Sequence, residues 1–177
     1  MFNLFNYNLY GYTQEGNLEI RNPDSYQHPD SHSDGFGNNR LCAMRTITLI
    51  IIHCSAVRPG QQSSLGDIDR WHRARGWKSC GYHFVVRRDG TIETGRPVEQ
   101  VGAHCRYHNK YSIGICYEGG LDVSGMPADT RTAEQKAALS FLVDCLKERF
   151  PRALVLGHHD LDPMKECPCF NVVKEYK

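Results

Sequence analysis

Three apolar runs along the chain have the length and composition of β-strands. The first, TITLIIIH at residues 46–53, is rich in β-branched residues, and the others are SIGICYEGG at 112–120 and ALVLGHH at 153–159. An unbroken β-branched run such as the first is typical of a strand covered on both faces. We therefore expect three strands here, with the first in the interior of a sheet.

Two segments carry the start and stop signals of amphipathic helices. A capping box of the Ser-x-x-Asp type at Ser64 opens a helical pattern that stops at Gly76. A Thr-x-x-Gln box at Thr132 opens a longer one that ends at Phe150, before a proline. The inner face expected for this second helix consists of Ala138, Phe141, Leu142, Cys145 and Leu146.

A hairpin lies between these helices. The stretch GYHFVVRRDGTIETG at residues 81–95 reads as two strands around an Asp-Gly turn, which is a strong hairpin signal. Strands and helices thus alternate, with at least one antiparallel connection. This order predicts an α/β fold in which helices pack on a single mixed β-sheet.

The chain divides into two parts at Met44. Residues 1–43 are rich in polar residues and glycine and show no apolar periodicity, so they predict a disordered N-terminal extension. Residues 44–177 are the expected folded domain. The early aromatic residues leave an alternative open, in which this segment adds a strand or docks on the domain: Phe2, Phe5, Tyr7, Tyr10 and Tyr12.

Composition and charge exclude several classes of function. The chain has 177 residues and a formal net charge of +1, which argues against a broad nucleic-acid-binding surface. No apolar run is long enough to span a membrane, and the first twenty residues do not resemble a signal peptide. We expect a protein that is cytoplasmic as synthesised.

The chain contains eight cysteines. A protein without a secretion signal usually keeps its thiols reduced, and several of these residues sit inside apolar runs. We expect no structural disulfide among them. They are Cys42, Cys54, Cys80, Cys105, Cys116, Cys145, Cys167 and Cys169.

Two of the expected strands end in histidine. The run at 46–53 ends in His53, and the run at 153–159 ends in His158 and His159. Cys167 follows nine residues after His158, on a proline-containing loop that can fold back to the strand end. Strand ends at one edge of an α/β sheet are where sites usually collect. Two histidines and a cysteine there suit a catalytic Zn²⁺ ion with an open fourth position.

The spacing alone leaves this zinc site open. A histidine at a strand end is more often a hydrogen-bonded rim residue, and no compact C-x-x-C or H-E-x-x-H motif is present. Because side chains alternate along a strand, only one of His158 and His159 can face the metal, and the pattern does not say which.

Several motifs from Met44 onward resemble one family. They are IIIHCSAVRP, IDRWHRARGWKSCGYHFVVRRDGTIETGR, VGAHCRYHN, SIGICYEGG and HHDLDPMKECPCF. In this order they resemble the zinc-dependent N-acetylmuramoyl-L-alanine amidases, which include small phage lysozymes and, more distantly, peptidoglycan recognition proteins. The resemblance implies a Zn²⁺ cofactor held by His53, His158 and Cys167 at one edge of the sheet, and Tyr82 and Lys165 as catalytic residues.

The resemblance also implies a substrate: peptidoglycan, cut at the amide bond between N-acetylmuramic acid and L-alanine. His104 and Asn109 are weaker candidates for substrate contact, His104 alternatively for support of the metal site and Asn109 for holding the nearby loop. The CPCFN segment departs from the family pattern, with Cys169 where serine is common. Without an export signal, the enzyme is expected to act on the cell wall after release or export.

Two other functions stay open at this point. One is a peptidoglycan-binding module that keeps the fold but has lost cleavage. The other is a zinc-stabilised regulator of an unknown intracellular protein partner, because some phage lysozymes of this family also inhibit an RNA polymerase.

Overall fold

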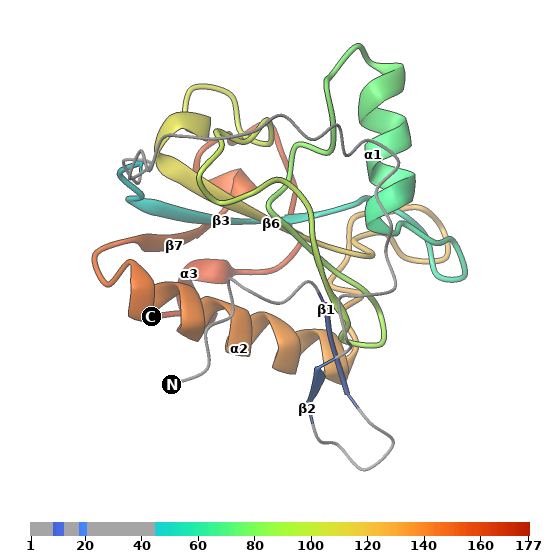
Figure 1. Ribbon diagram of the computed structural model, residues 1–177. Coiled ribbons are helices and arrows are strands. Elements are labelled where there is room, and N and C mark those ends of the chain that lie inside the picture. The colour runs from blue at the N-terminus through green and yellow to red at the C-terminus, as the bar shows by residue number, and fades with distance from the viewer. Residues whose placement is uncertain (1–8, 13–17, 21–44) are drawn as a thin grey trace.

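The computed structural model describes residues 9–12, 18–20 and 45–177. Their centre is a seven-stranded mixed sheet with the order β2-β1-β5-β4-β6-β3-β7 (Figure 1). β3 runs parallel to β6 and β7, and β6 runs parallel to β4, whereas the other pairs are antiparallel. The mixed sheet expected from the sequence is confirmed. The strands are β1 Leu9–Tyr12, β2 Leu18–Ile20, β3 Leu49–Cys54, β4 Phe84–Val86, β5 Ile92–Thr94, β6 Ser112–Tyr117 and β7 Leu154–Gly157.

Helices cover both faces of this sheet. α1 (Leu65–Ala74) lies on one side, and α2 (Ala133–Arg149) and the short α3 (Val172–Glu175) lie on the other (Figure 1). Two single-turn 3₁₀ helices, η3 (Asn109–Tyr111) and η4 (His158–Asp160), stand at strand ends. No helix in the described ranges is long and apolar enough to cross a membrane.

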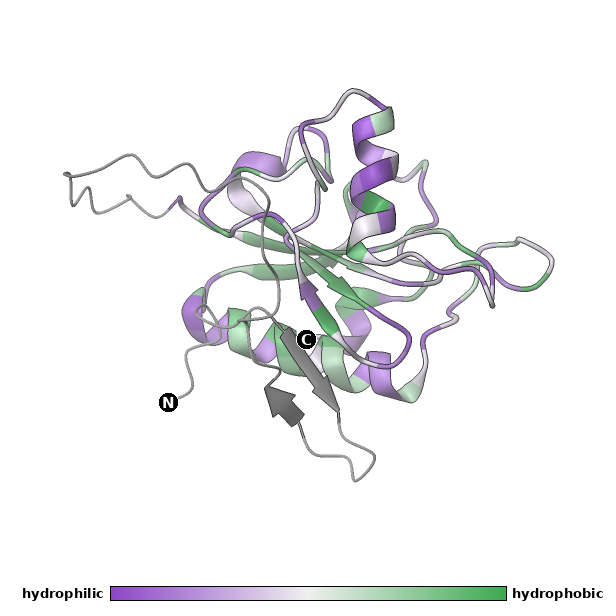
Figure 2. Cartoon of the chain, turned by 45° about the vertical axis from the view of Figure 1, so that its right-hand side comes forward, coloured by the Kyte–Doolittle hydropathy of each residue, from purple (hydrophilic) through white to green (hydrophobic). Residues whose placement is uncertain are grey.

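The middle of the sheet is the core of the fold. Ile50, Ile51 and Ile52 of β3 are all fully buried, as the apolar run predicted. Figure 2 shows the central strands in hydrophobic colours between α1 and α2. Burial on both faces removes β3 from solvent from Ile50 to Cys54, so a polar side chain at its end needs partners within the protein.

Both expected capping boxes are present. Ser64 caps α1 together with Asp67, and Thr132 caps α2 together with Gln135. The buried stripe of α2 differs from the expected one, because Phe141 is only half-buried. Cys145 is half-buried too, and the fully buried positions are Gln135, Ala138, Leu139, Leu142, Val143 and Leu146.

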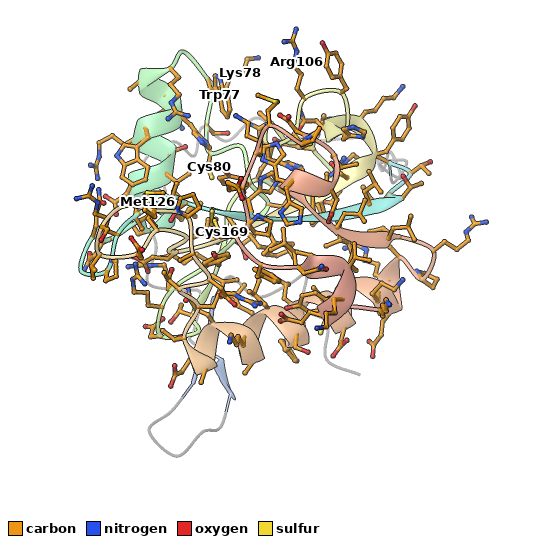
Figure 3. All side chains as sticks on the ribbon, turned by 180° about the vertical axis from the view of Figure 1, so that it is seen from behind. Trp77, Lys78, Cys80, Arg106, Met126 and Cys169 are labelled. Carbon is orange, nitrogen blue, oxygen red and sulfur yellow. The ribbon has the colours of Figure 1, made fainter. Side chains whose placement is uncertain are left out.

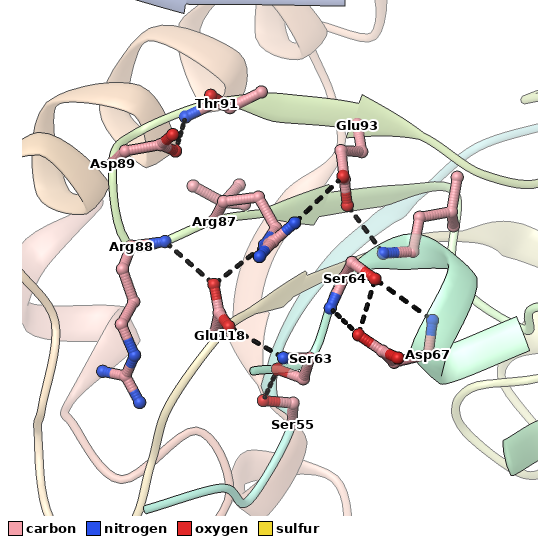
Figure 4. A network of polar contacts seen from close by, with 12 residues as sticks. Ser55, Ser63, Ser64, Asp67, Arg87, Arg88, Asp89, Thr91, Glu93 and Glu118 are labelled. Atoms are coloured by element: carbon pink, nitrogen blue, oxygen red, sulfur yellow. Dashed lines mark hydrogen bonds and ion pairs between the residues drawn. The ribbon is translucent and has the colours of Figure 1, made fainter. Parts of the chain in front are cut away.

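A charged network fixes the hairpin against α1 (Figure 4). Glu118, just after β6, accepts hydrogen bonds from the backbone of Ser63 at 2.7 Å and from Nε of Arg87 at 2.8 Å. Glu93 of β5 accepts the backbone N–H of Leu65 at 2.6 Å, at the start of α1. These carboxylates therefore bind the first turn of α1 to two strands.

Part of the predicted N-terminal extension forms strands. β1 pairs with β5 through Leu9 opposite Glu93 and Tyr10 opposite Ile92, and β2 pairs with β1. These pairings add two strands at the edge of β5, which offers unpaired backbone groups. The disordered extension expected for residues 1–43 stays a prediction. The remainder of residues 1–43, and Met44, lie outside the described residues. The boundary at Met44 stays a prediction.

Candidate metal centre

His53, His158 and Cys167 come together at the carboxyl ends of β3 and β7. Ile52 is paired with Gly157 in the parallel ladder, so the next residues, His53 in β3 and His158 just after β7, lie at the same sheet edge. One ligand atom from each of His53, His158 and Cys167 lies within 4.8 Å of the other two. No other such group of three His, Cys, Asp or Glu side chains occurs among the residues that the structure describes.

Backbone contacts bring the Cys167 loop back to the sheet. The N–H of His159 donates to the carbonyl of Cys167 at 2.8 Å. The hydroxyl of Tyr117 in β6 donates to the carbonyl of Pro168 at 2.6 Å. The Cys167 sulfur accepts the N–H of Cys54 at 3.2 Å, which places it beside His53. The loop is therefore held on both sides of the candidate ligand.

The two adjacent histidines have different surroundings. His158 lies against His53, with ring centroids 4.6 Å apart. His159 turns away, with Nε2 3.3 Å from Asp160 and Nδ1 3.5 Å from the carbonyl of Glu166. The one-turn helix that begins at His158 separates the two rings, so the structure brings His158 into the cluster and leaves His159 outside it.

His53 has a partner on each ring nitrogen. Its Nδ1 lies 3.8 Å from the Cys167 sulfur, and its Nε2 lies 3.1 Å from Nδ1 of His104. His104 in turn has Nε2 3.3 Å from the hydroxyl of Ser112. We assign the proton of His53 to Nε2, donating to His104, because this leaves Nδ1 free to bind a metal. His104 therefore contacts the candidate ligand His53 on the side of its ring away from Cys167. Its contact with substrate stays a prediction.

A glycine in β6 makes room for His104. A Cβ at Gly114 would lie 2.4 Å from the His104 ring, and one at Gly102 would lie 2.6 Å from it. Gly114 is not among the site residues predicted from the sequence. The signal was available, since a glycine inside an apolar strand often marks a close approach by another group.

Asn109 holds the loop that carries His104. Its side-chain oxygen accepts the backbone N–H groups of His104 and Cys105 at 2.8 and 2.9 Å. Both acceptor contacts are internal, so the structure assigns Asn109 a supporting position. Its predicted contact with substrate remains untested.

Tyr82 lies beside the cluster as a neutral phenol. Its ring centroid is 5.2 Å from that of His53 and 5.5 Å from that of His72. His72 accepts the N–H of Gly81 at 2.9 Å, which fixes the segment before Tyr82. Burial raises the pKa of Tyr82 well above its usual value, so the hydroxyl keeps its proton at neutral pH.

Lys165 is exposed, two residues before Cys167. Its charge reaches the cluster, since it is one of the groups that lower the pKa of His158, after the larger effect of burial. Trp77, Lys78 and Arg106 lie along the top of the view in Figure 3, on the α1 side of the sheet. The α1 side of the sheet therefore carries both charged and aromatic side chains.

The cluster has the chemistry of a zinc site. Burial lowers the pKa of His53 and His104 well below the usual value and lowers that of His158. All three imidazoles are therefore neutral at neutral pH, which is the form that binds metals. Two neutral imidazoles and a thiolate, with an outer hydrogen bond on one histidine, suit Zn²⁺.

Comparison with protein families agrees with this geometry. A family model described as N-acetylmuramoyl-L-alanine amidase matches residues 43–170. This range includes all three candidate ligands, Tyr82 and Lys165, and it covers well over half of the chain.

The chain belongs to the N-acetylmuramoyl-L-alanine amidase family.

Phage endolysins are among the similar sequences. The endolysin of Enterobacteria phage K11 is 39% identical over 126 residues, covering 71% of this chain and 83% of that protein. The endolysin of Escherichia phage T7 is 39% identical over 123 residues, covering 70% and 81%. The expectation of an amidase that cuts peptidoglycan is confirmed.

Solved structures extend the amidase comparison. The N-acetylmuramoyl-L-alanine amidase LysC from Clostridium intestinale superposes with a TM-score of 0.64 at 30% identity, covering 76% of this chain and 83% of the other. Drosophila PGRP-LB superposes with a TM-score of 0.62 at 26% identity, covering 75% and 80%. The amidase fold expected from the sequence is therefore confirmed.

Proposed function

We propose that this amidase hydrolyses the bond between N-acetylmuramic acid and L-alanine with one Zn²⁺ ion bound by His53, His158 and Cys167. The meeting of these three side chains at one sheet edge is the observation that carries the proposal. When bound, zinc supplies Lewis acidity, which polarises an amide carbonyl and lowers the pKa of water. The protein's own side chains position the ligands and contact the reacting groups.

His104 and Cys167 prepare the site for the metal. His104 accepts the Nε2 proton of His53 and so directs Nδ1 toward Cys167. Cys167 provides the sulfur ligand, and its sulfur accepts the N–H of Cys54. These contacts tie the candidate ligands to the rest of the fold and so restrict where their ligand atoms can lie.

Tyr82 and Lys165 are proposed to act on the reacting groups. The neutral Tyr82 hydroxyl beside His53 can hold a hydrogen bond to the attacking water or to the oxygen that gains negative charge. Lys165, as a cation on the same loop as Cys167, can stabilise that oxygen in the tetrahedral intermediate. Neither residue is needed to hold the metal.

Peptidoglycan is the proposed binding partner, and the cell wall after release or export is the proposed place of action. Phage endolysins at about 40% identity support this. A binding-only module is less well supported because the complete set of candidate zinc ligands is present. A regulatory role toward a protein partner stays open, and a pull-down with and without residues 1–43 would detect one.

Metal analysis combined with product analysis tests the proposal. Purified protein should contain about one zinc per chain and should clear cell walls, with new L-alanine amino groups and no new reducing sugars. Chelation should abolish clearing, and added zinc should restore it. New reducing sugars without new amino groups would show glycan cleavage instead and would contradict the proposal.

A further inference from the structure

Two thiols face each other directly beside the candidate metal centre. The sulfurs of Cys54 and Cys169 are 3.8 Å apart, although the residues are 115 positions apart in the chain. Cys54 is the last residue of β3 and is buried. Cys169 is half-buried and follows Pro168 on the loop that carries Cys167 (Figure 3). The pair therefore spans the junction between the central strand and this loop.

A glycine packs against the two sulfurs. Gly120 lies against the pair, where a Cβ would be 2.4 Å from the Cys54 sulfur and 3.7 Å from the Cys169 sulfur. The thiol of Cys169 donates to the carbonyl of Gly120 at 3.2 Å. The sulfurs are already at hydrogen-bonding distance, so a disulfide would shorten their separation from 3.8 Å to a bonded length of about 2 Å.

We propose that Cys54 and Cys169 are a reversible disulfide site, which closes in an oxidising environment and fastens the Cys167 loop to β3. Cys167 is not part of this bond. Its sulfur accepts the N–H of Cys54 and lies 3.8 Å from Nδ1 of His53, which keeps it in the candidate ligand set. The disulfide and the metal site thus use different sulfurs of one loop.

The chemistry is thiol–disulfide exchange with an external low-molecular-mass disulfide. The neighbouring Cys54 thiol and burial raise the pKa of Cys169, so its thiolate forms slowly. Once deprotonated, Cys169, the more exposed thiol, attacks the external disulfide, releasing one thiol and forming a mixed disulfide. Cys54 then loses its proton and attacks the Cys169 sulfur, releasing the second thiol. Two electrons pass from the protein dithiol to the external disulfide, which is reduced to two thiols. Without a catalyst this exchange takes minutes to hours.

The bond would stabilise the folded protein. It closes a loop of more than a hundred residues, which restricts the unfolded chain strongly. It also adds a covalent link to the loop that is otherwise held by Tyr117 and by the backbone of His159. We expect the thermal midpoint to rise by on the order of 5–10 °C on oxidation.

Peptide mapping of the zinc-loaded full-length protein tests the proposal. Samples are incubated with oxidised glutathione or with a phosphine reductant, free thiols are alkylated, and disulfide-linked peptides are identified by mass spectrometry. Cys167 and Cys169 share the tryptic peptide 166–174. Fragment ions must therefore assign the bonded sulfur, and Cys169→Ser provides an independent assignment.

The expected result is a Cys54–Cys169 link in the oxidised sample, a raised thermal midpoint and an unchanged zinc content. Cys169→Ser should lose the link and the thermal shift, whereas Cys145→Ser, a half-buried thiol on α2, should keep both. Absence of the link, a Cys54–Cys167 link, loss of zinc on oxidation or a thermal midpoint that does not rise would overturn the proposal. The link and the thermal shift do not depend on the proposed catalytic function, whereas the zinc measurement does.

Discussion

Nε2 of His53 lies 3.1 Å from Nδ1 of His104, on the side of the ring opposite Cys167. An outer partner of this kind fixes the tautomer and orientation of a metal-binding histidine, and its loss usually costs about 10- to 100-fold in metal affinity. His104 belongs to a different loop from every candidate ligand. Its contribution to metal binding can therefore be tested without removing a ligand.

His104→Ala should bind zinc about 10- to 100-fold more weakly than the unchanged protein, measured by competition with a chromogenic chelator. His104→Asn should recover part of the affinity, because the asparagine oxygen can accept the same proton. Gly114→Ala should also weaken zinc binding, since its Cβ would displace the His104 ring. Zinc affinity that is unchanged in His104→Ala would refute the positioning role.

Substitutions of the proposed ligands, compared with substitutions of nearby residues of the same type, test the ligand assignment. Cys167→Ser and His158→Ala should lose zinc and activity together, because each removes one of three protein ligands. Cys169→Ser and His159→Ala are the matched controls and should keep their zinc and nearly all their activity under reducing conditions. The readouts are metal content after gel filtration and clearing of cell walls. If the control variants lost zinc and the first pair retained it, Cys169 and His159 would be the ligands in place of Cys167 and His158.

Tyr82→Phe and Lys165→Ala should separate chemistry from metal binding. Both variants should retain zinc, and each should lose about 100-fold or more in hydrolysis rate, the usual effect of removing a positioned acid–base or oxyanion group. Rates are measured by release of L-alanine amino groups from purified peptidoglycan. A variant that loses its zinc would instead have a structural role at the centre.

The stability of the zinc-free protein should decrease in mild acid. Burial lowers the pKa of His83 to about 4 and also lowers that of His53 and His104. In the unfolded chain these groups titrate near pH 6.5. Above pH 6.5 these histidines are unprotonated in both the folded and the unfolded protein. Between about pH 6.5 and 4 they gain a proton only in the unfolded protein, so the free energy of unfolding decreases as the pH falls.

The free energy of unfolding should decrease by up to about 1.4 kcal/mol per pH unit for each buried histidine, measured by urea unfolding at a series of pH values. Stability that is constant across this range would mean that the buried histidines do not stay neutral in the folded protein.

A chain that begins at Met44 should fold and clear cell walls about as well as the full chain. Among the described residues, the ladder that it loses on β5 pairs only Leu9 with Glu93 and Tyr10 with Ile92. Circular dichroism and clearing assays on both lengths provide the comparison. If removal of residues 1–43 unfolds the protein, the domain boundary lies further toward the N-terminus.

Local patterns in the sequence determined the elements of this fold. The capping boxes at Ser64 and Thr132, the Asp-Gly hairpin and the β-branched run before His53 each depend on residues within a few positions of one another. Such short-range preferences act before any tertiary contact forms, which is why they could be predicted. The resemblance to the amidase family, carried by motifs in a fixed order, predicted the activity as well.

Long-range contacts decided the rest. The choice between His158 and His159 depends on the one-turn helix after β7, and the support of His53 by His104 depends on the space above Gly114. The approach of Cys54 to Cys169 joins positions 115 residues apart, and neither residue carries a local sign of the other. The buried stripe of α2 is likewise set by the strands beneath it, where Gln135 finds backbone partners. These features arise from packing between distant segments, and only the folded chain brings those segments together.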